Sequence, residues 1–99
     1  MIRSFRDEQA ERLFQRMVVK KLSRDLQRAA LRELLLIDAA ETLNDLRVPP
    51  GNRLETGNRL EKLTGDRVGQ FSIRINDQWR ICFEWSDGDA YEVEIVDYH

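Results

Sequence analysis

The alternation of apolar and polar positions divides the chain into two unlike halves. In residues 1–46, two sets of apolar residues recur at the three- and four-residue spacing of a helix face. Asp7 and Ser23 stand just before these sets, and both residue types accept hydrogen bonds from the free amides at a helix start. Two helices are therefore predicted, with these apolar residues on their buried faces: Ala10, Leu13, Phe14 and Met17 in the first, and Leu26, Ala30, Leu34 and Ile37 in the second.

The two ends of this helical half are predicted from different signals. The second helix should continue toward Leu46, because the run from Ala29 to Leu46 contains neither glycine nor proline. The Pro-Pro-Gly run at 49–51 then stops it, since proline lacks the amide that a helix requires. At the N-terminus, Ile2 and Phe5 fit either a short strand or an extended arm.

Residues 70–96 change to the two-residue period of strands. Three alternating runs are separated by turn-forming residues at 76–77 and 86–89, which predicts an antiparallel meander. Since so small a sheet is not stable alone in water, the two helices must cover its apolar face. The prediction is an α+β fold in which two N-terminal helices pack on a small antiparallel sheet.

Composition excludes several classes of protein. The 99 residues suffice for one domain, expected over residues 1–99, and a net charge of −2 excludes nucleic-acid binding by a uniformly basic surface. One cysteine (Cys82, expected to be an inert thiol) and one histidine exclude an internal disulfide and offer too few ligands for a structural zinc site. The apolar runs are too short to span a bilayer and no signal segment is evident, so a cytoplasmic protein without membrane contact is expected.

Residues 47–69 fit no regular element and are predicted to form a loop. The pentapeptide Gly-Asn-Arg-Leu-Glu occurs at 51–55 and again at 57–61, and this six-residue spacing matches neither a helix nor a strand. One interpretation is a small duplication absorbed by a surface loop. The other is that the second copy adds Arg59 to a ligand-binding edge.

Charge is unevenly placed along the second half of the chain. Residues 53–80 carry six bases and four acids, whereas the last predicted strand and the turn before it carry acids alone. Arg74 and Arg80 alternate with the apolar residues of neighbouring strands, so they are predicted to share the sheet face away from the core. Arginines on such a face can bind phosphate bidentately, or they can pair with strand acids such as Glu84 or Glu92.

The chain closes with Asp97, Tyr98 and His99, which place an acid, a phenol and the only imidazole of the sequence consecutively. Beside a sheet that carries arginines, this set can support general acid–base chemistry near neutral pH. A solvated chain end is the other interpretation.

Several sequence features resemble the HigB branch of the RelE/ParE toxins. They are the run from Leu63 to Phe83, with its Gly-Asp-Arg and Ser-Ile-Arg-Ile-Asn-Asp-Gln-Trp-Arg-Ile segments, the preceding Pro-Pro-Gly-Asn-Arg-Leu-Glu, and the closing Asp-Tyr-His. The resemblance implies a microbial-RNase-like α+β fold and a type II toxin that cleaves mRNA in the ribosomal A site. The implied partner is a HigA-like helix-turn-helix antitoxin, through which alone the toxin would contact operator DNA.

The chemistry implied by the resemblance is RNA cleavage without metal or cofactor. The ribose 2′-OH attacks the adjacent phosphate and the 5′-oxygen leaves, which requires a base, an acid and cations for the developing charge. Carried over by position, Arg80 would stabilise the phosphate, and Asp97 would orient His99. Tyr98 and His99 would transfer protons or stack on a base. Backbone phosphates would be held by Lys62, Arg67 and Arg74.

Two departures from the pattern of these toxins open an alternative. Glu61 and Thr64 stand where related toxins often carry active-site His and Lys, and Lys62 is the nearest base. The sequence pI of about 5.4 is also unusual, because such toxins are commonly basic. The alternative is a ParE-like or catalytically weakened module that acts through a protein partner without RNA cleavage.

Overall fold

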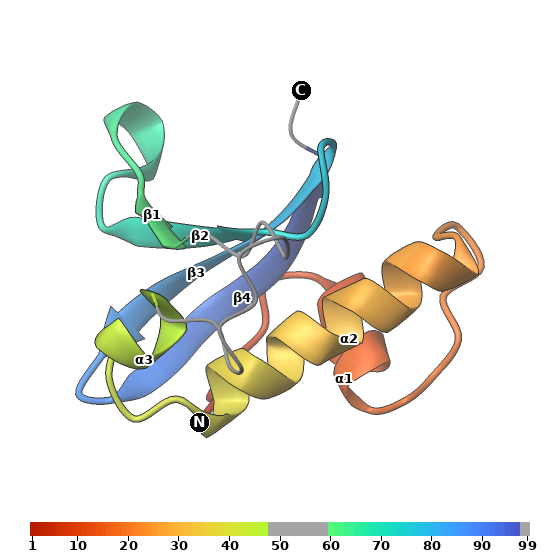
Figure 1. Ribbon diagram of the computed structural model, residues 1–99, viewed down its shortest axis with the longest axis horizontal. Helices are drawn as coiled ribbons and strands as arrows, with labels where there is room; N and C mark the ends of the chain where they lie inside the picture. The colour runs from red at the N-terminus through yellow and green to blue at the C-terminus, as the bar shows by residue number, and fades with distance from the viewer. Residues whose placement is uncertain (48–59, 98–99) are drawn as a thin grey trace.

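Two main helices pack on a four-stranded antiparallel sheet (Figure 1). The computed structural model describes residues 1–47 and 60–97. In chain order the elements are α1 (Glu8–Phe14), α2 (Arg24–Ala39), α3 (Asn44–Arg47), β1 (Leu60–Lys62), the short 3₁₀ helix η3 (Gly65–Arg67), β2 (Gln70–Arg74), β3 (Trp79–Ser86) and β4 (Asp89–Asp97). The strands lie in the order β1-β2-β3-β4. The predicted α+β class, with N-terminal helices on an antiparallel sheet, is confirmed.

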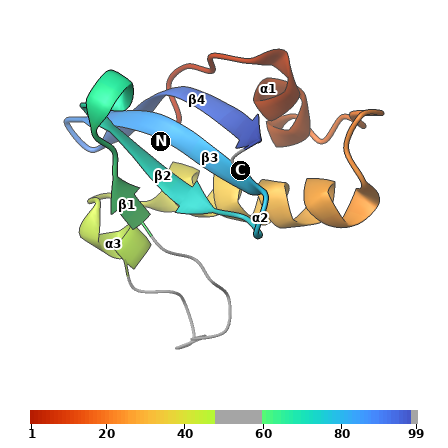
Figure 2. The ribbon, with the colours of Figure 1, turned by 90° about the horizontal axis from the view of Figure 1, so that it is seen from above.

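The hydrophobic core lies between α2 and one face of the sheet. The strand register aligns Ile73, Ile81 and Ile95 across β2, β3 and β4. These three isoleucines belong to the same buried cluster as Leu34 and Ile37 of α2. Each such side chain contributes about 1.5–3 kcal/mol when it is fully buried, so this layer is the main source of stability. Helix α1 completes the cluster where it contacts α2 and β4 (Figure 2).

An extended N-terminal arm runs beside β4. Isolated parallel bridges join Ile2 and Phe5 to this strand. Asp7 follows the arm as the predicted helix cap, and its carboxylate accepts hydrogen bonds from the amide of Ala10 at 2.7 Å and from the amide of Ile95 at 3.1 Å. Burial raises the pKa of Asp7, although both hydrogen bonds lower it. This one carboxylate therefore fastens the arm to both α1 and β4.

Helix α1 is shorter than its apolar pattern predicts. It ends at Phe14, and Arg16 then adopts a φ of 66°, the left-handed conformation that commonly terminates helices. The amide of Met17 donates to the carbonyl of Arg12 at 2.8 Å, which closes the turn. Met17 is 47% exposed, so the prediction that it shares the buried face is wrong.

Helix α2 begins after its predicted cap, Ser23, whose hydroxyl accepts a hydrogen bond from an amide of the first turn. It ends at Ala39, so the predicted continuation toward Leu46 is wrong. The carboxylate of Asp45 accepts hydrogen bonds from the backbone amides four and three residues before it. Because these bonds compete with helical ones, the chain leaves α2 and starts the separate turn α3.

The segment predicted as a loop over 47–69 contains two regular elements, β1 and η3. Because β1 pairs with β2, the sheet has four strands rather than the three predicted. The first copy of the duplicated pentapeptide lies outside the described residues, as do Arg59, Tyr98 and His99. Across residues 1–47 and 60–97, no helix has the length and apolar character that crossing a membrane requires.

Candidate functional site

The sheet face that turns away from the core carries polar side chains. One aligned row crosses all four strands and consists of Glu61, Ser72, Cys82 and Glu94. Arg74 and Arg80 are directly paired in the next row, which confirms the prediction that they share a face. Ser72 and Cys82 have no exposed surface, so they form the floor of this face beneath the longer charged side chains.

Arg80 is held from two sides on this face. Its Nη1 donates to the hydroxyl of buried Ser72 at 3.1 Å, and its Nη2 donates to Oε1 of Glu61 at 3.2 Å. The side chain of Arg80 is only 18% exposed, whereas that of Glu61 is 50% exposed. The guanidinium is therefore fixed from below by a neutral hydroxyl and met at its outer side by a solvated carboxylate.

Arg67 reaches the same face from η3, the turn between β1 and β2. Its Nη1 donates to Oε1 of Gln70 at 3.0 Å and to Oε2 of Glu94 at 3.1 Å. Glu94 also lies 3.7 Å from the guanidinium of Arg6. Gly65 precedes Arg67 with a φ of +65°, and the space around its Cα is open, so glycine is needed there for backbone conformation. The turn thus presents Arg67 above β4.

Arg74 has a different setting, at the β2–β3 turn. It pairs with the carboxylate of Asp77 and donates from Nε to the carbonyl of Asn76 at 3.2 Å. Acids do pair with the arginines, as one interpretation of the sequence predicted, but the partners are Glu61 of β1, Asp77 of the β2–β3 turn and Glu94 of β4 rather than Glu84 or Glu92. Glu92 instead accepts from the Ser4 hydroxyl, because a bulge between β3 and β4 and its own φ of 54° redirect it.

The other residues named from the sequence do not all meet these arginines. Lys62 is aligned with Phe71, one position along β1 from Glu61, so strand alternation places it on the opposite face from Arg80. Asp97 closes β4 opposite Trp79 and accepts a hydrogen bond from the side chain of Gln78 at 3.2 Å. The roles of Tyr98 and His99, which lie beyond the described residues, stay predictions.

Cys82 sits among the charged groups of this face. Burial raises the pKa of its thiol, and the nearby Arg67 and Arg80 lower that pKa only in part. A buried, protonated thiol is a poor nucleophile, in keeping with the expectation of an inert cysteine. In the part of the chain that the structure describes, no three His, Cys, Asp or Glu side chains gather as a metal site would require.

Three anchoring residues, Ser72, Gln70 and Glu94, were not identified from the sequence as part of the site. Strand alternation places all three on the polar face, which is the only sequence signal they give. Which arginine each one holds depends on the turn at η3 and on contacts between residues as far apart as Arg67 and Glu94.

Comparisons with known proteins agree on a family. A family model described as the RelE-like toxin of type II toxin–antitoxin system HigB matches residues 3–99. "Toxin HigB-1" of Vibrio cholerae is 45% identical over 65 residues, which cover 66% of this chain and 62% of that protein. "Endoribonuclease HigB" of Proteus vulgaris is 36% identical over the full length of both chains.

Solved structures share the same architecture. A toxin of the YoeB–YefM toxin–antitoxin complex from Staphylococcus aureus matches with a TM-score of 0.57 and 19% identity, covering 100% of this chain and 98% of that one. The YoeB dimer from the same organism matches with a TM-score of 0.53, also at 19% identity, over 99% and 97% of the two chains. At this identity the likeness establishes the fold.

Proposed function

The chain belongs to the HigB-like family of RelE-like toxins of type II toxin–antitoxin systems, and from this premise we propose that it is an endoribonuclease that cleaves translated mRNA. The full-length similarity to a Proteus vulgaris protein named as an endoribonuclease supports this activity. The proposed setting is the cytoplasm, with mRNA in the ribosomal A site as substrate. A HigA-like helix-turn-helix antitoxin would neutralise the toxin and carry all contact with operator DNA.

The proposed reaction is an intramolecular transesterification that needs no metal. A base removes the proton of the ribose 2′-OH, the 2′-oxygen bonds to phosphorus, and the bond from phosphorus to the 5′-oxygen breaks. The leaving 5′-oxygen takes up a proton, and the other fragment ends in a 2′,3′-cyclic phosphate. In the assignment carried over from the family, His99 and Tyr98 transfer these protons and Asp97 orients His99.

The observation that carries the proposal is the pre-oriented pair of arginines on the polar sheet face. Arg80 is anchored by Ser72, and Arg67 by Gln70 and Glu94, so neither guanidinium must be ordered when a phosphate arrives. A phosphate that approaches Arg80 must displace Glu61. Because half of the Glu61 side chain is exposed, water can solvate its carboxylate once it is displaced, which limits the cost of this exchange.

One observation favours the alternative of a binding module without nuclease activity. Arg67, Arg74 and Arg80 each already have a carboxylate partner among the described residues, so this face carries little excess positive charge. Such balance would weaken capture of free RNA and would increase reliance on the ribosome for positioning.

Primer extension separates the two proposals. Expression of the chain is induced in cells that carry one reporter message in two forms, with and without its ribosome-binding site. We expect new 5′ ends within the coding region of the translated form alone. Growth arrest with both messages intact would instead identify a ParE-like toxin, and cleavage of both forms alike would contradict dependence on the ribosome.

A further inference from the structure

The connection between α1 and α2 carries a strong charge imbalance. Residues 12–32 contain seven bases and one acid, Asp25, in a chain whose net charge is −2. The seven, called here the basic corner, are Arg12, Arg16, Lys20, Lys21, Arg24, Arg28 and Arg32. All seven are exposed, and none forms an ion pair with an acid of residues 1–47 or 60–97. Like charges held together repel one another, so the corner is suited to an anionic partner.

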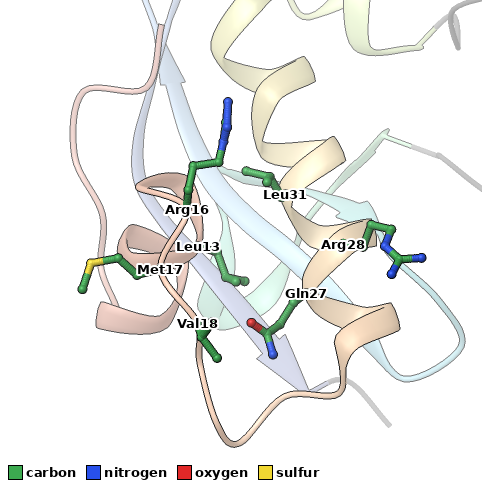
Figure 3. Close-up of a pocket in the computed structure, with 7 residues that line it drawn as sticks. All are labelled: Leu13, Arg16, Met17, Val18, Gln27, Arg28 and Leu31. Atoms are coloured by element: carbon green, nitrogen blue, oxygen red, sulfur yellow. The ribbon is translucent and has the colours of Figure 1, made fainter.

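Apolar surface is interleaved with this charge. Val18 is 75% exposed and Met17 47% exposed, and two grooves meet at Val18. One groove, of about 230 Å³, lies between α1 and α2, where Leu13 and Leu31 line it beside the basic Arg16 (Figure 3). The other, of about 340 Å³, is lined by Arg12, Lys20 and Lys21, by Val18 and Val19, and by Glu8 and Gln9 of α1, so three bases and one acid border it.

The chain holds this apolar surface outward. Gln27 of α2 accepts from the amide of Val19 at 3.0 Å and donates to the carbonyls of Val19 at 2.9 Å and Leu22 at 2.7 Å. Val19 and Leu22 are buried, so the segment is pinned on both sides of Lys20 and Lys21. Because its neighbour Val19 is fixed in the core, Val18 cannot turn inward without breaking these bonds.

The basic corner lies at the opposite end of the molecule from η3 and β1. In both views the orange connection between α1 and α2 and the green turn at η3 occupy opposite sides (Figures 1 and 2). Arg74 and Arg80 lie at the other end of β2 and β3, but on the sheet face opposite the one that α2 covers. The corner is therefore separate from the arginines of the polar sheet face, and the proposed cleavage chemistry does not use it.

We infer that the basic corner and its two grooves bind an acidic, amphipathic segment of the antitoxin, an inference that rests on the proposed antitoxin partner but not on the nuclease activity. Carboxylates of such a segment meet the seven bases, which have no ion-pair partner among residues 1–47 and 60–97, and its apolar side chains cover Val18 and enter the grooves. RNA phosphates would satisfy only the charge. No aromatic side chain lines either groove, although aromatic stacking is the usual way in which single-stranded bases are held.

The test measures the affinity of purified variants for the antitoxin of this toxin–antitoxin system. Val18→Ser removes apolar contact, and the double variant Arg16→Gln/Arg28→Gln removes charge. We expect each to weaken binding about tenfold, the loss that follows when one apolar contact or one pair of rim charges is removed from an interface. Only the double variant should also reduce the dependence of affinity on salt.

Matched controls come from elsewhere on the surface. Val68 is 74% exposed and Arg47 is exposed at α3, so Val68→Ser repeats the valine change away from the corner and Arg47→Gln removes one arginine charge there. We expect both controls to bind the antitoxin like the unmodified chain. No variant should lower the thermal unfolding temperature of that chain, because each changes only exposed side chains.

Three results would overturn the inference. The first is that the unmodified chain forms no complex with the antitoxin, and the second is that Val18→Ser binds the antitoxin with unchanged affinity. The third is that the arginine double variant still binds the antitoxin but no longer binds a 16-base-pair RNA duplex. The last result would identify the corner as an RNA surface. Cleavage by the same variants without antitoxin is scored separately, so failure of the nuclease proposal is distinguishable from failure of this one.

Discussion

The polar sheet face and the basic corner are both rich in arginine, but their charges are balanced in opposite ways. Arg67, Arg74 and Arg80 each have a carboxylate partner, and buried Ser72 supports one of them from below. At the corner, seven bases stand without such partners among the described residues. Paired guanidiniums are fixed in direction, whereas unpaired ones attract anions from a distance.

The difference suggests two kinds of work for the same residue type. A reaction that develops charge on one phosphate needs donors that are already oriented, and the carboxylates and hydroxyl of the sheet face supply that order. A docking surface gains from a larger field and tolerates mobile side chains. Composition hides this distinction, because the chain as a whole is slightly acidic.

The largest expected effect concerns Arg80. Replacing Arg80 with alanine should lower the rate of RNA cleavage by about 10²–10³-fold, the usual loss when one donor to a developing charge is removed. Arg28→Ala, a matched change at the basic corner, should leave cleavage unchanged. Primer extension and growth arrest after induction measure both. An equal loss of RNA cleavage in the two variants would show that the sheet face and the basic corner do not differ in this function.

A smaller effect should follow from unbalancing the sheet face. Glu94→Ala leaves Arg67 and Arg6 without their shared carboxylate, and we expect the free energy of unfolding to fall by about 1–2 kcal/mol. Glu84 lies on the same face and makes no ion pair within the described chain, so Glu84→Ala should change the free energy of unfolding by less than about 0.5 kcal/mol. Urea titration compares the two, and equal losses would show that the pairing at Glu94 is not stabilising.

The smallest effect is expected at the corner. Lys20→Gln/Lys21→Gln removes two like charges that have no partner among the described residues, so the free energy of unfolding should stay equal or rise by up to about 0.5 kcal/mol. Added salt should reduce the difference in unfolding free energy between this variant and the unmodified chain, because salt screens the repulsion between the bases of the corner. A clear destabilisation in the same urea titration would mean that these lysines have stabilising contacts.

Local patterns in the sequence predicted β2, β3, β4 and the polar face well, but not the short β1. Two-residue alternation alone places Arg74 and Arg80 on one side, and the predicted caps Asp7 and Ser23 both accept hydrogen bonds at helix starts. These features depend on neighbours within a few residues. Helix ends were less predictable, because Asp45 ends α2 through side-chain bonds that no apolar period records.

Contacts between residues far apart in the chain could not be predicted from the sequence. Glu94 is 27 residues from Arg67, and its choice as partner depends on the turn at η3 and the register of β4. Lys62 looked equivalent to the arginines in sequence, yet one position of strand alternation places it on the other face. The bases of residues 12–32 are plain in the sequence, but only the fold shows that they have no ion-pair partner in the described part of the chain and that five of them line grooves.

The central claim, that RNA is bound by the arginines of the sheet face, is tested most directly by nuclear magnetic resonance on the labelled protein. The ligand is a short RNA with a single 2′-deoxy position, which blocks attack on the adjacent phosphate. We predict that amide shifts cluster around Arg67, Arg74 and Arg80 and leave residues 12–32 unchanged. Shifts confined to residues 12–32, with the sheet face unaffected, would contradict the account.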